Sequence, residues 1–341
     1  MSAKNKTMYK VAMAGLGRIA LELEKDLKRE KPCTHAGTYQ AFENKLEVVG
    51  GYDPHHEKKQ GFLEFFPYAQ YFSSIKEMIE TTKPHVLSIA SPSFTHLEVF
   101  EELKNLSHYP KLIWLEKPVE ISLKKALKIA KIAKKMGSFV LVNHERRFDS
   151  AYQGVQKIIL DKKLGPIKSI HAMMYRGKPS KLPAGSGTLL EDGTHLLDIL
   201  FFLTQEKPLS HTGKLEFLDN IKVEKRAYGT LYFKNFPVFL DSGGERKYFH
   251  FELDINLEQG RIRIGNGVLD ITQAQDSPYY EGFKSLLPTN TFEFETKQNM
   301  FINLGQAICD FLEKGEIPHS SLKDALKVME LSHAIYKKWK V

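Results

Sequence analysis

The chain has 341 residues, which is more than one hydrophobic core usually holds, so two domains are expected. Hydrophobic residues make up 42% of the sequence, charged residues 26% and aromatic residues 11%, a mixture that excludes a fibrous or disordered chain. Lysine and arginine outnumber aspartate and glutamate by 49 to 41, giving a net charge of +8. This mild excess favours anionic small molecules such as dinucleotides and phosphorylated sugars.

Membrane, metal and nucleic-acid functions are not indicated. No run approaches the roughly 18 consecutive apolar residues of a membrane span, and none near the start suits a signal peptide, so a cytoplasmic protein is expected. The two cysteines, Cys33 and Cys309, form no Cys-x-x-Cys pair, and no metal site is predicted. The lysines between Lys124 and Lys135 alternate with apolar residues at helical spacing, which indicates a solvated helix face rather than a nucleic-acid or membrane surface.

The first half alternates short β-branched runs with helical segments, the pattern of a parallel sheet with helices on both faces. Ser74 with Glu77 and Thr95 with Glu98 each fit the capping box that opens a helix. We therefore predict an α/β fold whose first domain, residues 1–148, is a doubly wound parallel sheet with strands at Tyr9–Ala14, Leu46–Tyr52, Val86–Ala90, Leu112–Leu115 and Phe139–Val142.

The second half, residues 149–341, has a different pattern and is predicted as a second α/β domain. Helices are expected at Tyr152–Leu160 and Leu190–Leu203, with a strand at Lys168–Tyr175. Alternating runs then favour an open, mostly antiparallel sheet with strands near Gly229–Phe233, Tyr248–Ile255 and Arg261–Ile264. Two closing helices are expected in this domain, over Asn299–Leu312 and Ser321–Lys338.

A glycine-rich turn follows the first strand and is expected to open a helix. Gly15 suits the tight turn, Gly17 lets the backbone approach a pyrophosphate, and Ala20 is small enough for close packing of helix on strand. Arg18 and Ile19 lie between these positions. This pattern predicts a dinucleotide site.

Asp53 ends the second predicted strand, where a carboxylate accepts hydrogen bonds from the adenosine ribose and repels a 2′-phosphate. NAD is therefore expected as the cofactor, with NADP left open because His55, His56, Lys58 and Lys59 are nearby. Asp53 lies further from the glycines than usual, because Leu21 to Cys33 reads as an inserted charged helical segment to which we assign no role.

Three further stretches resemble the glucose-fructose oxidoreductase, inositol dehydrogenase and MocA (Gfo/Idh/MocA) family. They are Ser91-Pro92-Ser93-Phe94-Thr95-His96, Glu116-Lys117-Pro118, and the run from Gly185 through Glu191, Asp192 and His195 to Asp198. The resemblance covers nearly the whole chain. It implies a Rossmann domain followed by an α/β domain, whose open sheet makes a homodimer or homotetramer.

The resemblance also implies roles for single residues. Ser91, Pro92 and His96 would flank the cofactor, and Glu116 and Lys117 would lie beside the nicotinamide, with Lys117 also contacting substrate and taking part in catalysis. The family's motif after the last Rossmann strand implies substrate contacts for His144 and Arg147.

His195 is the second implied catalytic and substrate-binding residue, because a carboxylate-held histidine can take a hydroxyl proton while hydride leaves the same carbon. Helical spacing puts Glu191 four residues and Asp192 three residues before it. The family usually has Asp at the position of Glu191, so either carboxylate remains a candidate for orienting the imidazole.

These features together predict an NAD(P)-dependent dehydrogenase acting on a secondary alcohol of a sugar, cyclitol or nucleotide-linked sugar. Two alternatives stay open: a hydrolase that uses NAD transiently to cleave a glycosidic bond, and a non-catalytic regulator that binds dinucleotide. Lys117 and His195 argue against the regulator, which would need neither.

Overall fold

A computed structural model describes residues 7–177, 187–218, 223–292 and 299–339. The chain divides into two compact units. Residues 1–148 and 298–327 form the first unit, and residues 149–297 and 328–341 form the second.

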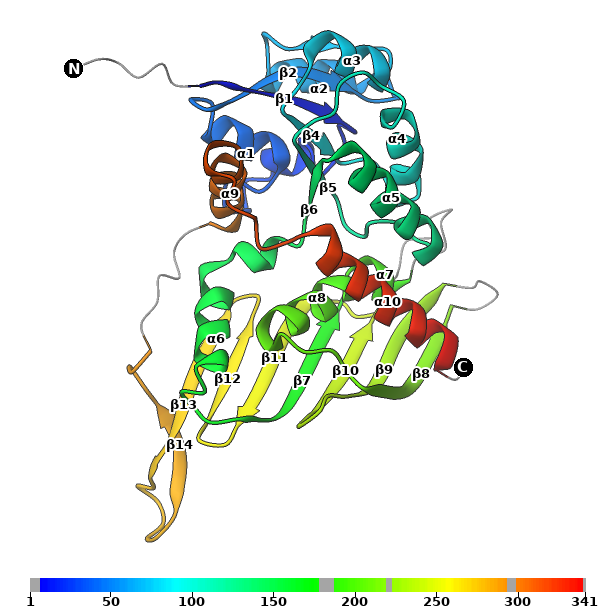
Figure 1. The fold of residues 1–341 in the computed structure, drawn as a ribbon. Coiled ribbons are helices and arrows are strands. Elements are labelled where there is room, and N and C mark those ends of the chain that lie inside the picture. The colour runs from blue at the N-terminus through cyan, green and yellow to red at the C-terminus, as the bar shows by residue number, and fades with distance from the viewer. Residues whose placement is uncertain (1–6, 178–186, 219–222, 293–298, 340–341) are drawn as a thin grey trace, which may run out of the picture. The chain divides into compact units, whose positions relative to one another are not determined.

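The first unit contains a six-stranded parallel sheet, in the order β3-β2-β1-β4-β5-β6 (Figure 1). Its strands are β1 (Tyr9–Ala14), β2 (Leu46–Tyr52), β3 (Gln70–Tyr71), β4 (Val86–Ile89), β5 (Leu112–Leu115) and β6 (Phe139–Val142). The predicted doubly wound sheet is confirmed, with the two-residue β3 added and β4 one residue shorter than expected. The strand order reverses between β1 and β4, where ligands bind beyond the carboxyl ends of the strands.

Helices cover both faces of this sheet, which is why β4 and β5 are buried along their whole length. Figure 1 shows α1 with α9 on one side and α4 with α5 on the other. The bounds are α1 (His35–Ala41), α2 (Lys58–Phe65), α3 (Ile75–Thr82), α4 (His96–Leu103), α5 (Leu123–Met136) and α9 (Met300–Lys314).

One of the two predicted capping boxes is present. The Ser74 hydroxyl accepts from the backbone N–H of Glu77 at 3.1 Å and caps α3. The prediction for Thr95 was wrong, because its backbone is already helical (φ −98°, ψ −10°) and its hydroxyl donates to Ser91 and Pro92 instead. An N-cap residue needs extended backbone to reach forward along the helix.

The second unit contains an eight-stranded sheet in the order β14-β13-β12-β11-β7-β10-β9-β8. Neighbouring strands are antiparallel except for β7 with β10, so the predicted mostly antiparallel sheet is confirmed. The strands are β7 (Ile167–Tyr175), β8 (Ser210–Phe217), β9 (Glu224–Tyr232), β10 (Pro237–Gly243), β11 (His250–Leu257), β12 (Gly260–Gly265), β13 (Val268–Asp276) and β14 (Lys284–Pro288).

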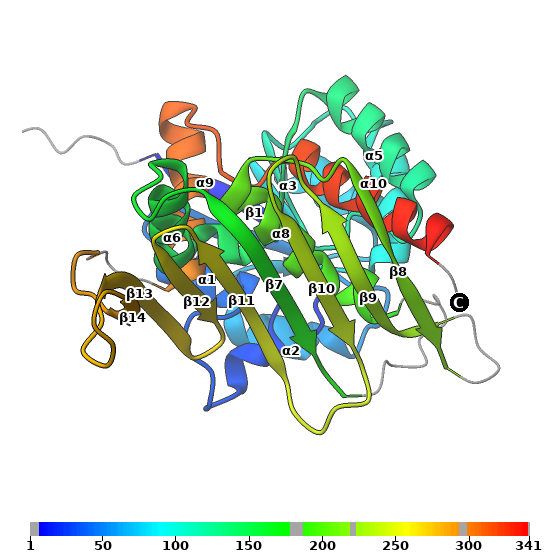
Figure 2. The same ribbon diagram turned by 90° about the horizontal axis from the view of Figure 1, so that it is seen from below.

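One face of this sheet packs against α6 (Ser150–Leu160), α8 (Gly193–Thr204) and the end of α10 (Leu322–Lys338). The short α7 (Thr188–Glu191) leads directly into α8. Figure 2 looks onto the opposite face, over which no helix of the described residues lies. That face carries paired charges, including the bidentate ion pairs of Arg261 with Asp254 and Arg226 with Asp241.

The closing helices differ from the expected division of the chain. α9 belongs to the first unit, because Phe301, Leu304 and Ile308 lie on one helix face and are buried in the core around the parallel sheet. Gly305 lets α9 approach α1, since a Cβ there would lie 2.5 Å from the ring of Phe42. The second unit therefore does not run unbroken from residue 149 to the end, and α10 passes from the first unit into the second.

Candidate functional site

The predicted phosphate-binding glycines form a tight turn after β1. Gly15 has φ +89°, and a Cβ there would lie 2.4 Å from the backbone nitrogen of Ser91. Only glycine fits where this turn crosses the loop after β4. At Gly17, by contrast, a Cβ would meet nothing within 4 Å. The second glycine thus faces open space at the position where a pyrophosphate is expected.

The backbone of the same turn retains hydrogen-bond donors. Among the described residues, no group accepts from the N–H groups of Gly17, Arg18 and Ile19. Ala20, the small third residue, is fully buried in the core of the first unit. N–H groups gathered at the start of a helical turn bind anions. The residues present therefore fit a dinucleotide pyrophosphate.

Asp53 connects the glycine turn to the end of β2. One carboxylate oxygen accepts from the backbone N–H of Leu16 at 2.8 Å, and the other accepts from that of His55 at 2.9 Å. The side chain is nearly buried, at 8% exposure. Because a carboxylate offers about four acceptor positions, lone pairs of Asp53 stay available for ribose hydroxyls.

The first helix does not run on directly from the glycine turn as expected. The chain leaves it after Ala20 and returns at His35, where α1 begins. The N–H of His35 donates to the carbonyl of Ile19 at 3.2 Å, and that of Ala36 donates to the carbonyl of Ala20 at 2.9 Å. The turn and α1 therefore share one hydrogen-bond ladder, and residues 21–34 form an excursion from it.

The excursion contains a short 3₁₀ helix, Glu22–Lys25, rather than the longer charged helix that we predicted. Glu24 closes it, since its carboxylate accepts from the backbone N–H of Cys33 at 3.0 Å and from the hydroxyl of Thr34 at 2.6 Å. Thr34 in turn caps α1 by accepting from Gly37. The inserted segment thus fixes where α1 starts.

The loop after β4 carries Ser91 and Pro92 at the carboxyl edge of the sheet, against the glycine turn. His96 is placed differently from the expectation of a cofactor contact. Its ring is fully buried, with Nε2 2.9 Å from the carbonyl of Ser91 and Nδ1 3.0 Å from that of Val119. Burial lowers the pKa of His96. The imidazole therefore joins the loops after β4 and β5 beneath the surface.

Glu116 and Lys117 follow β5 at the same edge of the sheet. The Glu116 carboxylate accepts from Asn143 and, at 3.3 Å, from the backbone N–H of Lys117, and it lies 3.0 Å from Nε2 of His35. Burial alone would raise the pKa of Glu116, but the hydrogen bonds from His35 and Asn143 and the charge of Lys117 outweigh burial and lower it. An ionised carboxylate therefore adjoins Lys117, which is half-buried.

Sequence reasoning missed His35. It is completely buried, and no motif singled it out, because the excursion separates it from the glycine turn. The hydrogen bond from the His35 N–H to the carbonyl of Ile19 gives His35 the place that the fourth residue after Ile19 would have in an unbroken helix.

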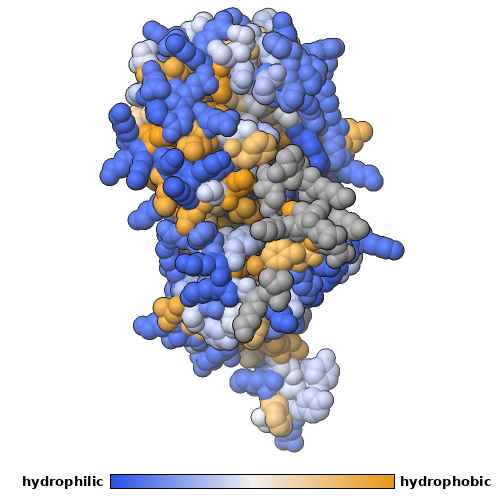
Figure 3. Space-filling view, turned by 90° about the vertical axis from the view of Figure 1, so that its right-hand side faces the viewer, coloured by the Kyte–Doolittle hydropathy of each residue, from blue (hydrophilic) through white to orange (hydrophobic). Residues whose placement is uncertain are grey.

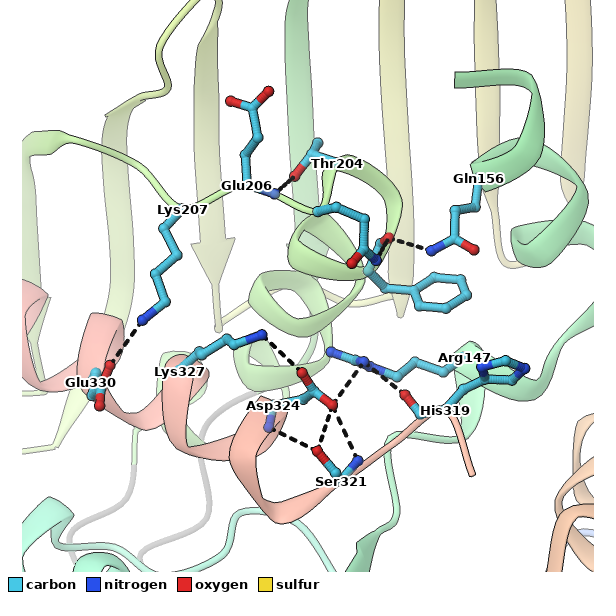
Figure 4. Close-up of polar contacts among 12 residues, drawn as sticks. Arg147, Gln156, Thr204, Glu206, Lys207, His319, Ser321, Asp324, Lys327 and Glu330 are labelled. Carbon is cyan, nitrogen blue, oxygen red and sulfur yellow. Dashed lines mark hydrogen bonds and ion pairs between the residues drawn. The ribbon is translucent and has the colours of Figure 1, made fainter. Parts of the chain in front are cut away.

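The motif after β6 has a structural role that we did not predict. Arg147 is 4% exposed and donates to the carbonyl of His319 at 2.9 Å, and its guanidinium lies 3.6 Å from Asp324 (Figure 4). Asp324 also accepts from Ser321 and Lys327. These contacts tie the start of α10 and the segment before it to the end of the parallel sheet, and a substrate contact by Arg147 stays a prediction.

His144 is also buried, at 3% exposure, and its backbone N–H donates to Val142 at 2.7 Å. Its neighbour Glu145 pairs with Arg146, and burial raises the pKa of Glu145 while the charges of Arg146 and Lys117 oppose that rise. Lys117 therefore lies close enough to Glu116 and Glu145 for its charge to act on both carboxyls.

In the second unit, Glu191 and Asp192 both pair with Arg176, Glu191 at 2.8 Å. The backbone N–H of His195 donates to the carbonyl of Asp192 at 3.0 Å, and the imidazole is half-buried on the first turn of α8. Arg176 brings the two candidate carboxylates together. Gly185 and Ser186, which begin the resembling run, lie outside the described residues.

Glu224, on β9, is a second buried carboxyl that the sequence did not indicate. It is 1% exposed and accepts from the backbone N–H of Leu189 at 2.8 Å, at the start of α7. Burial raises the pKa of Glu224 to about 7, because the N–H of Leu189 and the other hydrogen bonds to the carboxyl offset desolvation only in part. A Cβ on Gly187 would lie 1.5 Å from this carboxyl, so glycine makes room for it.

The predicted lysine face is exposed on α5, where Ala126, Ile129 and Ala133 form the buried side. Figure 3, which views the side on which α5 lies, shows hydrophilic side chains over much of that face with separate hydrophobic patches. Within the described ranges, no helix has the length and apolarity to cross a membrane, and no cluster of three or more His, Cys, Asp or Glu is placed to hold a metal.

Comparisons with known proteins identify the family of both halves of the chain. Residues 9–144 match the "Oxidoreductase family, NAD-binding Rossmann fold", and residues 152–263 match the "GFO/IDH/MocA C-terminal domain". Glucose-6-phosphate 3-dehydrogenase of Bacillus subtilis is 25% identical over 229 residues, which cover 64% of this chain and 60% of that protein. The matches to the first curated relatives span about half to three fifths of the relatives' own length.

Two solved structures show the same fold across the chain. The WlbA dehydrogenase of Bordetella pertussis, in complex with NADH and UDP-GlcNAcA, has a TM-score of 0.76 at 17% identity and covers 97% of this chain and 95% of its own. A super-repressor mutant of Gal80p from Saccharomyces cerevisiae also has a TM-score of 0.76 at 17% identity, with 97% and 95% coverage.

Proposed function

Because the chain belongs to the Gfo/Idh/MocA family of NAD-binding oxidoreductases, we propose that it transfers a hydride between a nicotinamide dinucleotide and a secondary alcohol of a sugar, cyclitol or nucleotide-linked sugar. The observation that carries the proposal is the turn after β1. It combines N–H groups without an acceptor among the described residues, open space at Gly17 and a carboxylate at Asp53.

The pyrophosphate would be held by the backbone of Gly15, Gly17, Arg18, Ile19 and Ala20. Asp53 would accept from the adenosine ribose, and Ser91 and Pro92 would border the cofactor. When bound, the nicotinamide supplies the hydride acceptor or donor. The remaining chemistry must come from side chains of this chain.

Lys117 and His195 are the residues that we propose for that chemistry. The Lys117 ammonium would hold the reacting hydroxyl by a charge-assisted hydrogen bond, and the adjacent Glu116 charge would stabilise the ammonium. His195 would take the hydroxyl proton during oxidation and return it during reduction. Since Arg176 pairs with both Glu191 and Asp192, we propose that the two carboxylates act on His195 as one anionic group.

NAD is the proposed cofactor rather than NADP. Asp53 is a fixed anion at the ribose end, and the nearby Lys58 is paired with Glu22 at 2.6 Å. A 2′-phosphate would therefore meet a carboxylate and find this lysine already engaged. NADH binding tighter than NADPH binding, measured by fluorescence titration, is the expected result, and the reverse order would refute the assignment.

The substrate class rests on relatives that are named as dehydrogenases of glucose 6-phosphate, D-glucosides and inositol. A second copy of this chain, packed on the open sheet face in a dimer or tetramer, is the proposed partner. Sedimentation of the purified protein tests the assembly, since a monomer at micromolar concentration would contradict it.

The decisive experiment is a turnover screen of sugars, cyclitols and nucleotide sugars with NAD and NADP, followed by variants on the substrate found. Lys117→Ala and His195→Ala should each lower kcat by about 100- to 10,000-fold while changing NADH affinity little. Gly17→Val should do the opposite, folding normally but losing NADH binding. Near-normal turnover in both alanine variants would refute the proposed chemistry and favour a dinucleotide-binding regulator.

A further inference from the structure

A chain of polar side chains runs through the interior of the first unit and ends on Glu116. The hydroxyl of Tyr39 lies 2.6 Å from that of Ser88, Ser88 lies 2.9 Å from Nδ1 of His35, and Nε2 of His35 lies 3.0 Å from Glu116. His35 and Ser88 are fully buried, and Tyr39 is 1% exposed. The proposed function uses none of these three side chains.

The directions of these hydrogen bonds follow from Glu116. Asn143 and the backbone N–H of Lys117 both donate to Glu116, which favours the ionised carboxylate. A carboxylate can only accept, so Nε2 of His35 donates to it. A neutral imidazole then accepts at Nδ1 from the Ser88 hydroxyl, and Ser88 accepts from Tyr39. Every proton in this chain has an acceptor. A cationic His35 would donate to Ser88 as well, and one buried hydroxyl proton would lose its acceptor.

The position of the imidazole is also fixed by packing. The His35 ring stacks on Trp114 with centroids 3.6 Å apart and planes 18° from parallel. Glu24 and Thr34 fix the start of α1, of which His35 is the first residue. The ring therefore has its Nε2 aimed at the end of β5 before any ligand binds.

We propose that His35, as its Nε2–H tautomer, is a positioning residue that holds the Glu116 carboxylate and thereby sets the place and charge environment of Lys117. The link to Lys117 is direct, because Oε2 of Glu116 accepts the backbone N–H of Lys117 while Oε1 faces His35. Only the effect of His35 on catalysis rests on the proposed function. The hydrogen bonding itself is independent of which reaction is catalysed.

The tautomer can be tested without a substrate. Long-range ¹H–¹⁵N spectra of protein labelled with ¹⁵N-histidine, with His35 assigned by its loss in His35→Gln, should show a protonated Nε2 and an unprotonated Nδ1. An imidazolium or an Nδ1–H tautomer would overturn the proposal. Neither result depends on turnover, so failure of the proposed function leaves this test intact.

The effect on Lys117 is tested by two variants. His35→Phe keeps an aromatic ring against Trp114 but removes both hydrogen bonds, and His35→Gln retains an N–H donor toward Glu116. Trace acetylation followed by peptide mass spectrometry should show altered Lys117 reactivity in His35→Phe, relative to the exposed Lys128 of α5, and near wild-type reactivity in His35→Gln. Unchanged Lys117 reactivity in folded His35→Phe would overturn the proposal.

Once a substrate is known, His35→Phe should lower kcat by about 10- to 100-fold, with the Kd of NADH nearly unchanged and with rescue by His35→Gln. Equal losses in both variants would show that His35 serves only the core. Should His35→Phe fail to fold, the wild-type tautomer and the reactivity of Lys117 in His35→Gln decide the matter.

Discussion

Two buried glutamates, one in each unit, have opposite proton affinities. Glu116 is surrounded by donors from His35, Asn143 and the Lys117 backbone, and its pKa is lowered despite burial. Glu224 also accepts hydrogen bonds, among them the N–H of Leu189, but burial and the charge of Glu191 raise its pKa to about 7. The nearby charges also differ in sign, Lys117 for Glu116 and Glu191 for Glu224, and so help to decide which carboxyl is ionised near neutral pH.

The two carboxyls also have different neighbours. Glu116 immediately precedes Lys117, so a permanent charge there is consistent with an adjacent ammonium. Glu224 lies against the start of α7, ahead of the helix that carries His195. A carboxyl that changes charge near neutrality makes the stability of that region dependent on pH.

Removing the better-held carboxylate should have the largest effect. Glu116→Leu leaves the donors of His35, Asn143 and Lys117 without their acceptor, so we expect the free energy of unfolding to fall by about 3–5 kcal/mol. Chemical denaturation at pH 7 measures this. Glu116→Gln keeps one acceptor oxygen and should lose less, and an equal loss in both variants would mean that hydrogen bonding at this site contributes nothing.

Glu224→Gln should have the opposite sign. A carboxyl pKa raised from 4.5 to about 7 in the folded chain makes wild-type stability fall as pH rises between those values, by about 3 kcal/mol in total. The amide has no charge to bury, so we expect it to be more stable than wild type by about 2–3 kcal/mol at pH 8, with little difference at pH 5.

Thermal or urea unfolding across pH 4 to 9 checks this result. Glu116→Gln serves as the matched control. The pKa of the wild-type Glu116 carboxyl is lowered, so the stabilisation that this carboxylate gives is lost only as pH falls below about 4.5. If the two variants changed the same limb of the stability profile, the contrast between the two carboxyls would be wrong.

Gly187→Ala should destabilise the second unit by about 1–3 kcal/mol, because its Cβ would displace Glu224 and break the bond to Leu189. Gly61→Ala in α2, where a Cβ meets nothing within 4 Å, is the control and should be neutral or stabilising. In a double-mutant cycle with Glu224→Ala the two losses should not add, whereas additivity would show that the residues do not interact.

The smallest effect is expected at Asn143. Asn143→Ala removes one of the donors to Glu116 and should cost about 1 kcal/mol, and the loss should shift acid unfolding to higher pH because the carboxylate is less well held. Differential scanning fluorimetry from pH 3 to 7 measures both quantities. If the pH of acid unfolding did not change, Asn143 would not contribute to stabilising the Glu116 carboxylate.

The sequence predicted the parallel sheet closely because its strands are continuous apolar runs at regular intervals. β1, β2, β5 and β6 have their predicted bounds, and Gly15, Asp53, Ser91 and Glu116 all follow strands at one edge, as strand-end motifs should. Hydrophobic periodicity indicates which face of a segment is buried, and it can be read from neighbouring residues alone.

Long-range partners could not be predicted in this way. Arg147 was expected near substrate from its motif, but its position depends on His319 and Asp324, which are distant in the sequence. His35 was missed because the excursion hides its place on the first helix, and α9 was assigned to the wrong unit because an amphipathic helix does not specify which core it covers. Buried polar partners are set by the topology, which local patterns do not encode.

The ladder shared by the glycine turn and α1 has an electrostatic consequence. Peptide dipoles add along a continuous run of hydrogen bonds and place about half a positive charge at the amino end of a helix. Because His35 and Ala36 donate to Ile19 and Ala20, the dipoles of α1 add to those of the turn despite the residues inserted between them. An anion at Gly17 would therefore experience the dipoles of the seven-residue α1 in addition to those of the turn.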